Sequence, residues 1–72
     1  MRIYQSSDWF NTEKGRVFVI RRADPNVKVS EQLPSHGEIV SIDGQERTVI
    51  CAYGIGAAEF NYWPEILIHV KP

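Results

Sequence analysis

Two runs of β-forming residues, separated only by Asp43-Gly44, constrain the fold of this chain more than any other feature of its sequence. The first run is Gly37 to Ile42, and the second is Gln45 to Tyr53. A type I′ turn needs a positive φ at both of its central residues, and Asp-Gly is a favoured pair there because glycine has no Cβ to clash. The sequence therefore predicts a β-hairpin in the middle of the chain, and with it a β-rich domain.

The register of this hairpin stays open at the level of the sequence. A two-residue turn at Asp43-Gly44 would place Val40 opposite Arg47. A three-residue turn would instead pair Val40 with Thr48 and Ile39 with Val49, which matches apolar residues better across the strands. We prefer the three-residue turn on this ground.

The 72 residues are predicted to form one small β-rich domain, 1–72, because the chain is too short for two. A chain of this length buries only about 60% of the surface that its unfolded form exposes, so its core is marginal. Turn signals bound further β-rich runs at 2–5, 16–22 and 65–71, with a short edge strand at 27–29 and single helical turns at 30–33 and 57–60. No segment keeps a 3.6-residue apolar period. We therefore expect an all-β fold of about four to six strands, as a small β-barrel or a strongly bent antiparallel sheet.

Charge and cysteine content narrow the class of protein. The formal net charge is −1, so the chain lacks the overall basic charge of many nucleic-acid-binding proteins. Cys51 is the single cysteine, which excludes a disulfide within the chain and favours a reducing compartment. No apolar leader follows Met1, and apolar runs such as 17–20 are much shorter than the roughly 20 residues of a membrane helix. We expect a cytoplasmic protein that does not enter a membrane.

Catalytic and metal-binding patterns are weak. His36 and His69 lie 15 and 18 residues from Cys51, and neither forms a paired ligand motif with it. The segment 54–58 begins like a dinucleotide-binding loop, but it lacks the third glycine, and the chain is too short for the βαβ unit that such a loop needs. We therefore predict no enzyme activity, no metal and no cofactor, with Cys51 as a packing residue.

The first function hypothesis is docking to a protein partner or to a second copy of the chain. Aromatic residues gather in two loop-like segments, 9–10 and 60–64, and the candidates for protein contact are Trp9, Tyr62 and Trp63. The alternative is that these side chains close the ends of the core. Pro64 favours an extended backbone at Trp63, which would direct Tyr62 and Trp63 to opposite sides of the segment.

The second function hypothesis is the binding of single-stranded nucleic acid, RNA in particular. Arg16, Phe18 and Arg22 share one face of the strand predicted at 16–22, and Arg21 is adjacent to them. Faces that combine aromatic and arginine side chains stack bases on small β-barrels. The alternative is that Phe18 belongs to the core and that the arginines flank the ends of the strand.

The order of strands and glycines also resembles a known family. Residues 15–19 form a G-x-V strand, a long loop follows, and residues 37–42 form a G-x-x-V-x-I strand with a return strand after it. This arrangement looks like the β-barrel domain that follows the GTPase domain of translation elongation and initiation factors, and the similarity spans Gly15 to Tyr53. The 72 residues contain no GTPase domain, and the segment 34–36 and the aromatic C-terminal third depart from the family. The resemblance implies a Greek-key barrel that docks protein or RNA, and it implies no catalytic residue.

Overall fold

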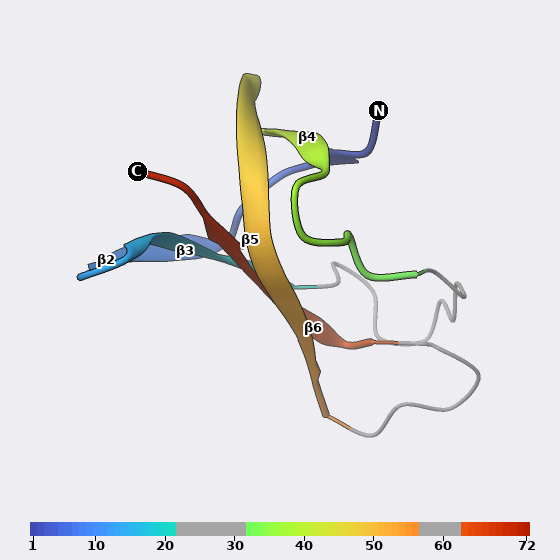
Figure 1. The fold of residues 1–72 in the computed structure, drawn as a ribbon. Helices are drawn as coiled ribbons and strands as arrows, with labels where there is room; N and C mark the ends of the chain where they lie inside the picture. The colour runs from blue at the N-terminus through green and yellow to red at the C-terminus, as the bar shows by residue number, and fades with distance from the viewer. Residues whose placement is uncertain (22–31, 57–62) are drawn as a thin grey trace.

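The computed structural model describes residues 1–21, 32–56 and 63–72. Its six strands form one open sheet in the spatial order β1-β4-β5-β6-β3-β2 (Figure 1). Neighbouring strands are antiparallel except for β1 and β4, which are parallel. The strands are β1 (Ile3–Tyr4), β2 (Asp8–Thr12), β3 (Gly15–Arg21), β4 (Ile39–Ile42), β5 (Gln45–Ile55) and β6 (Glu65–Val70). The predicted all-β fold is confirmed, in the form of a strongly bent sheet that does not close into a barrel.

Strand β5 joins the two halves of the sheet. Its first residues pair with β4 and its later residues pair with β6, and it is the long yellow strand in Figure 1. The register shifts between Val49 and Cys51, so Ile50 is the extra residue of a β-bulge. A bulge bends its strand and increases the local twist. The bend brings the two halves of one face of the sheet together, and we call this the inner face. The core lies there and consists of Phe18, Ile20, Val40, Ile42, Val49, Ile66, Ile68 and Val70.

Strand β3 is central, as its two apolar faces predict, since it lies between β2 and β6. Phe18 and Ile20 belong to the inner face. Val17 and Val19 are buried on the outer face, where their register neighbours include Phe10 of β2 and Leu67 of β6. Burial on both faces is the environment in which β-branched residues stabilise a strand most.

Strand β2 corrects one expectation from the sequence. Trp9 and Phe10 do not lie in a loop; they form part of a five-residue strand that pairs in continuous register with β3. The alternation of a strand places their two side chains on opposite faces of the sheet. A short run with polar neighbours gives little signal by itself, and the long pairing with β3 decides its conformation.

The hairpin turn corrects a second expectation. Ile42 pairs with Gln45, and both turn residues have positive φ, 54° at Asp43 and 83° at Gly44. The turn is therefore the two-residue kind, and our preference for a three-residue turn was wrong. Val40 lies opposite Arg47 after all. This pairing is tolerated because the Arg47 guanidinium reaches the ring of Phe18 at the edge of the core.

Several predicted elements lie outside the described residues. They are the edge strand at 27–29, the helical turn at 57–60 and the start of the turn at 30–33. In the part of the chain that the structure describes, no helix has the length and apolar character to cross a membrane.

Asp43 also ties the hairpin turn to the N-terminal segment, and this contact predicts a pH dependence. Its Oδ1 accepts a hydrogen bond from the Ser6 backbone N–H at 2.8 Å, and its Oδ2 accepts one from the Ser6 hydroxyl. The Ser6 hydroxyl is the main cause that lowers the pKa of Asp43 below its ordinary value of 3.8. A carboxyl with a lowered folded-state pKa stabilises the fold fully above its unfolded pKa and loses this stabilisation as the pH falls through the folded pKa.

We therefore expect Ser6→Ala to lower the melting temperature near neutral pH, and we expect the difference to shrink as the pH falls below 3.8 and through the lowered folded-state pKa of Asp43. Thermal unfolding of both proteins across this range measures the effect. A melting-temperature difference that stays constant with pH would contradict the role of Asp43.

Candidate functional site

The inner face carries a contact between an exposed aromatic ring and an arginine, at the edge of the sheet. The register of β2 with β3 places Trp9 opposite Phe18 and Asn11 opposite Arg16, so all four side chains share this face. The guanidinium carbon of Arg16 lies 4.0 Å from the centroid of the Trp9 ring. Arg16 Nε also donates a hydrogen bond of 3.1 Å to Asn11 Oδ1. These contacts hold a cation against a tryptophan that is 49% exposed.

Phe18 lies just inside this contact and is only 3% exposed. The guanidinium carbons of Arg16 and Arg47 lie 5.9 Å and 5.4 Å from its ring centroid. Phe18 is therefore a core residue whose ring two cations border, and Trp9 supplies the aromatic surface that a ligand can reach. Sequence analysis missed Arg47, because only the two-residue hairpin register brings its side chain to the inner face.

The structure does not place the other two arginines of the nucleic-acid hypothesis beside Arg16. Arg21 lies at the opposite end of β3, where its Nε is 3.5 Å from Glu65 Oε2. Arg22 lies outside the described residues. The predicted strip of arginines along one strand is therefore not a single site among the residues described.

The structure also distinguishes between the aromatic candidates for protein contact. Trp63 is half-buried and packs against the core cluster. Its ring covers Gly54 so closely that a Cβ on Gly54 would lie 2.0 Å from Trp63 Cε3. Tyr62 lies outside the described residues, so the prediction that Tyr62 and Trp63 face opposite sides is not tested. Trp9 is the docking candidate with an exposed ring.

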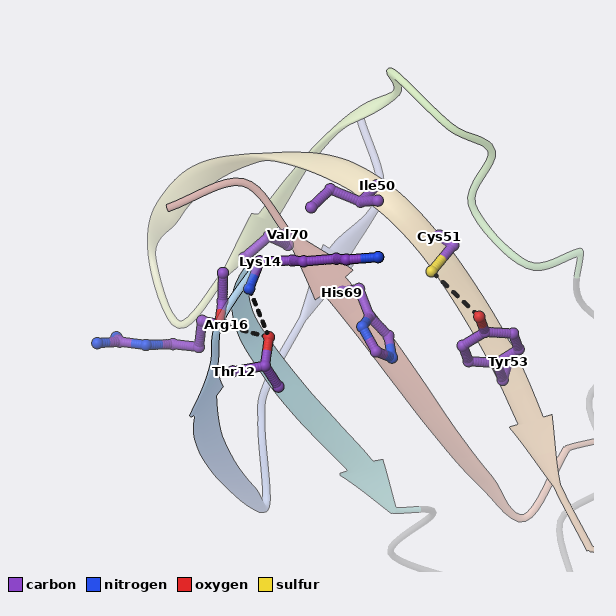
Figure 2. Close-up of a pocket in the computed structure, with 9 residues that line it drawn as sticks. Thr12, Lys14, Arg16, Ile50, Cys51, Tyr53, His69 and Val70 are labelled. Carbon is purple, nitrogen blue, oxygen red and sulfur yellow. Dashed lines mark hydrogen bonds between the residues drawn. The ribbon is translucent and has the colours of Figure 1, made fainter.

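The outer face has a separate pocket of about 230 Å³ near Cys51 (Figure 2). Register places Cys51 directly opposite His69. The Cys51 thiol donates a hydrogen bond of 3.4 Å to the Tyr53 hydroxyl, and the Tyr53 ring meets the His69 ring edge-on at 5.3 Å. The Lys14 side chain reaches across toward Cys51 in Figure 2. The pocket is lined by Thr12, Lys14, Gly15, Arg16, Ile50, Cys51, Tyr53, His69 and Val70.

The chemistry of this pocket follows from the thiol's partner. The hydrogen bond with Cys51 raises the pKa of Tyr53 above its ordinary value of 10.0, and the charge of a Cys51 thiolate adds to the shift. Tyr53 is thus a neutral phenol at physiological pH. A neutral phenol is a poor general base, so the hydrogen bond to Tyr53 does not by itself activate the Cys51 thiol as a nucleophile. Among the described residues, no group of three or more His, Cys, Asp or Glu side chains comes together for a metal ion.

No family model, curated protein or solved structure matches this chain. The resemblance to the β-barrel domain of translation factors therefore stays a prediction.

Proposed function

We propose that this domain is a protein-binding module that pairs an extended segment of its partner with the free edge of β2. One observation carries the proposal. Strand β2 is an edge strand exposed along all five residues, and it presents Trp9 and Phe10, 49% and 48% exposed, on opposite faces.

An edge strand leaves backbone N–H and C=O groups available to another chain, and natural proteins usually protect such an edge with charged side chains (especially Lys), Pro, a bulge or a short length. The sequence of β2, Asp-Trp-Phe-Asn-Thr, has no Lys or Pro, and its register with β3 shows no bulge. Its one charged residue, Asp8, accepts a hydrogen bond of 2.8 Å from the Trp9 backbone N–H, and a partner strand would have to compete with this contact. The opposite edge of the sheet, β1, has only two residues. Strand β2 is thus the edge best suited to strand addition by a partner.

The side chains on β2 match the chemistry of protein interfaces. Tryptophan and arginine are enriched among the residues that contribute most to binding, and Trp9 has Arg16 held against its ring. A partner strand beside β2 would bury part of Trp9 on the inner face and part of Phe10 on the outer face. The backbone would supply affinity and the two aromatic side chains would supply specificity.

A second candidate function, the binding of single-stranded nucleic acid, is favoured by the same Trp9–Arg16 contact. Tryptophan and arginine together stack bases without regard to sequence. We rank this function second, because the other ring of the predicted stacking surface, Phe18, lies in the core.

Alanine substitution of Trp9 tests the docking proposal. Peptides that bind this protein are first selected from a random library. They serve as the partner, since any peptide that pairs with the edge of β2 reports on that surface. We expect Trp9→Ala to weaken peptide binding about thirtyfold, which corresponds to about 2 kcal/mol for the loss of a central aromatic anchor. Amide hydrogen exchange should show new protection along β2 when the peptide binds.

Tyr53→Ala is the matched control, because Tyr53 is 53% exposed but lies on the interior strand β5. It should leave affinity within about twofold of the wild type. An equal loss of affinity in Tyr53→Ala, or peptide binding without protection of β2, would rule out docking at this edge. Sedimentation at increasing protein concentration then tells whether a second copy of the chain is itself a partner.

A further inference from the structure

The charged residues of the described chain are unevenly paired. Arg2 and Arg21 form ion pairs with Glu38 and Glu65, at 3.0 Å and 3.5 Å. In the described ranges, the other lysines and arginines have no carboxylate within ion-pair distance, and they are Lys14, Arg16, Arg47 and Lys71. All four line cavities at one end of the sheet, around the β2–β3 turn and the end of β6.

Three of these four residues, Arg16, Arg47 and Lys71, line one cavity on the inner-face side of this end. Its volume is about 320 Å³, roughly ten times the 30 Å³ that one water molecule occupies in the liquid. Glu13 is the single acidic side chain in its lining. The complete lining consists of Asn11, Thr12, Glu13, Gly15, Arg16, Arg47, Lys71 and Pro72.

The two arginines are oriented by neutral partners. Arg16 Nε donates to Asn11 Oδ1 at 3.1 Å, and an Arg47 terminal nitrogen donates to Gln45 Oε1 at 2.7 Å. An amide oxygen fixes a guanidinium in place without neutralising its charge, and one such bond uses one of five donors. Arg47 Nε is buried and finds no hydrogen-bond partner among the described residues. This nitrogen is closed to the cavity, so a ligand there would meet the terminal nitrogens of the guanidinium groups.

We propose that this cavity binds a phosphate group. Guanidinium groups match the oxygens of phosphate in geometry as well as charge, and an ammonium group such as that of Lys71 binds phosphate as a point charge. Inorganic phosphate and the phosphodiester backbone of a single-stranded nucleic acid share this chemistry. Trp9, whose ring contacts Arg16, lies where a base attached to the phosphate could stack. The phosphate site does not depend on the docking of a protein at β2.

Titration of the whole chain with inorganic phosphate at constant ionic strength tests the site, with backbone amide chemical shifts as the readout. We expect Lys71→Gln and Arg47→Gln each to raise the Kd about tenfold, as expected for the loss of one charged hydrogen-bond donor. Lys71 is exposed beyond the end of β6, so its substitution leaves the fold intact even where Arg47→Gln disturbs the packing around Phe18.

Arg21→Gln is the control, because it removes the same charge from the same strand as Arg16 but at the far end, beside Glu65. It should change the Kd less than twofold. A second titration with oligothymidylate at equal phosphate concentration separates the two sources of phosphate. A nucleic-acid backbone is the source of the phosphate if three results are found together. The oligonucleotide binds more tightly than inorganic phosphate, Trp9→Leu removes this extra affinity, and the Lys71 and Arg47 variants weaken binding.

Equal binding of inorganic phosphate and oligonucleotide phosphate, with the same losses in the two cavity variants, identifies a free phosphate group as the ligand. Two results would overturn the proposal. The first is the absence of shift changes with both ligands. The second is an equal weakening by Arg21→Gln, which would show that binding follows only the overall charge.

Discussion

Replacement of Gly15 by alanine is expected to leave a large fraction of this protein unfolded at room temperature. A Cβ on Gly15 would lie 2.2 Å from the carbonyl oxygen of Val70, which belongs to the backbone of the neighbouring strand β6. Gly15 also has a φ of 146°, a conformation that residues with a side chain rarely adopt. Val70 cannot move away without breaking the pairing of β3 with β6, so we expect a loss of about 4 kcal/mol. That is comparable to the whole stability of a domain this small.

Urea denaturation followed by circular dichroism measures this loss. Gly44→Asn is the control, because Gly44 has a φ of 83° but no atom within 4 Å of a Cβ placed there. Asparagine is common at such turn positions, so its cost should be below about 1 kcal/mol. Similar stabilities for the two variants would show that Val70 yields to a side chain at position 15. Gly15 also lines both cavities at this end of the sheet.

Gly54→Ala is expected to cost about 3 kcal/mol through its contact with Trp63. A Cβ at this position would lie 2.0 Å and 2.1 Å from two carbons of the Trp63 ring, which itself packs against the core. The ring must move out of its site to make room, and overpacking of this kind commonly costs 1–3 kcal/mol, occasionally more.

A double-mutant cycle tests this explanation. Trp63→Ala alone should cost about 2 kcal/mol, since the ring is half-buried, and it should remove most of the penalty of Gly54→Ala. We therefore expect a coupling of at least about 1 kcal/mol between the two positions. Costs that add within about 0.5 kcal/mol would show that Trp63 does not cover Gly54, and Trp63 would return as a candidate for partner contact.

The sequence by itself was sufficient for the features that depend on short-range chemistry. Asp43-Gly44 predicted the hairpin, because a tight turn needs positive φ at adjacent residues. The apolar residues on both faces of 16–22 predicted a central strand, which β3 is. The absence of a 3.6-residue period predicted a fold without long helices, and the described residues contain none. Each inference used residues within a few positions of one another.

Only the tertiary structure decided which distant residues meet. The bulge at Ile50 sets the pairing of β5 with β6, and this pairing places Cys51 opposite His69. The two-residue turn directs Arg47 to the inner face, where it joins Arg16 at the ring of Phe18. Strand β2 is found at the edge of the sheet only once the strand order is known. Shifting a strand by one residue exchanges its two faces, so the position of every side chain in these sites depends on long-range pairing that local propensity does not determine.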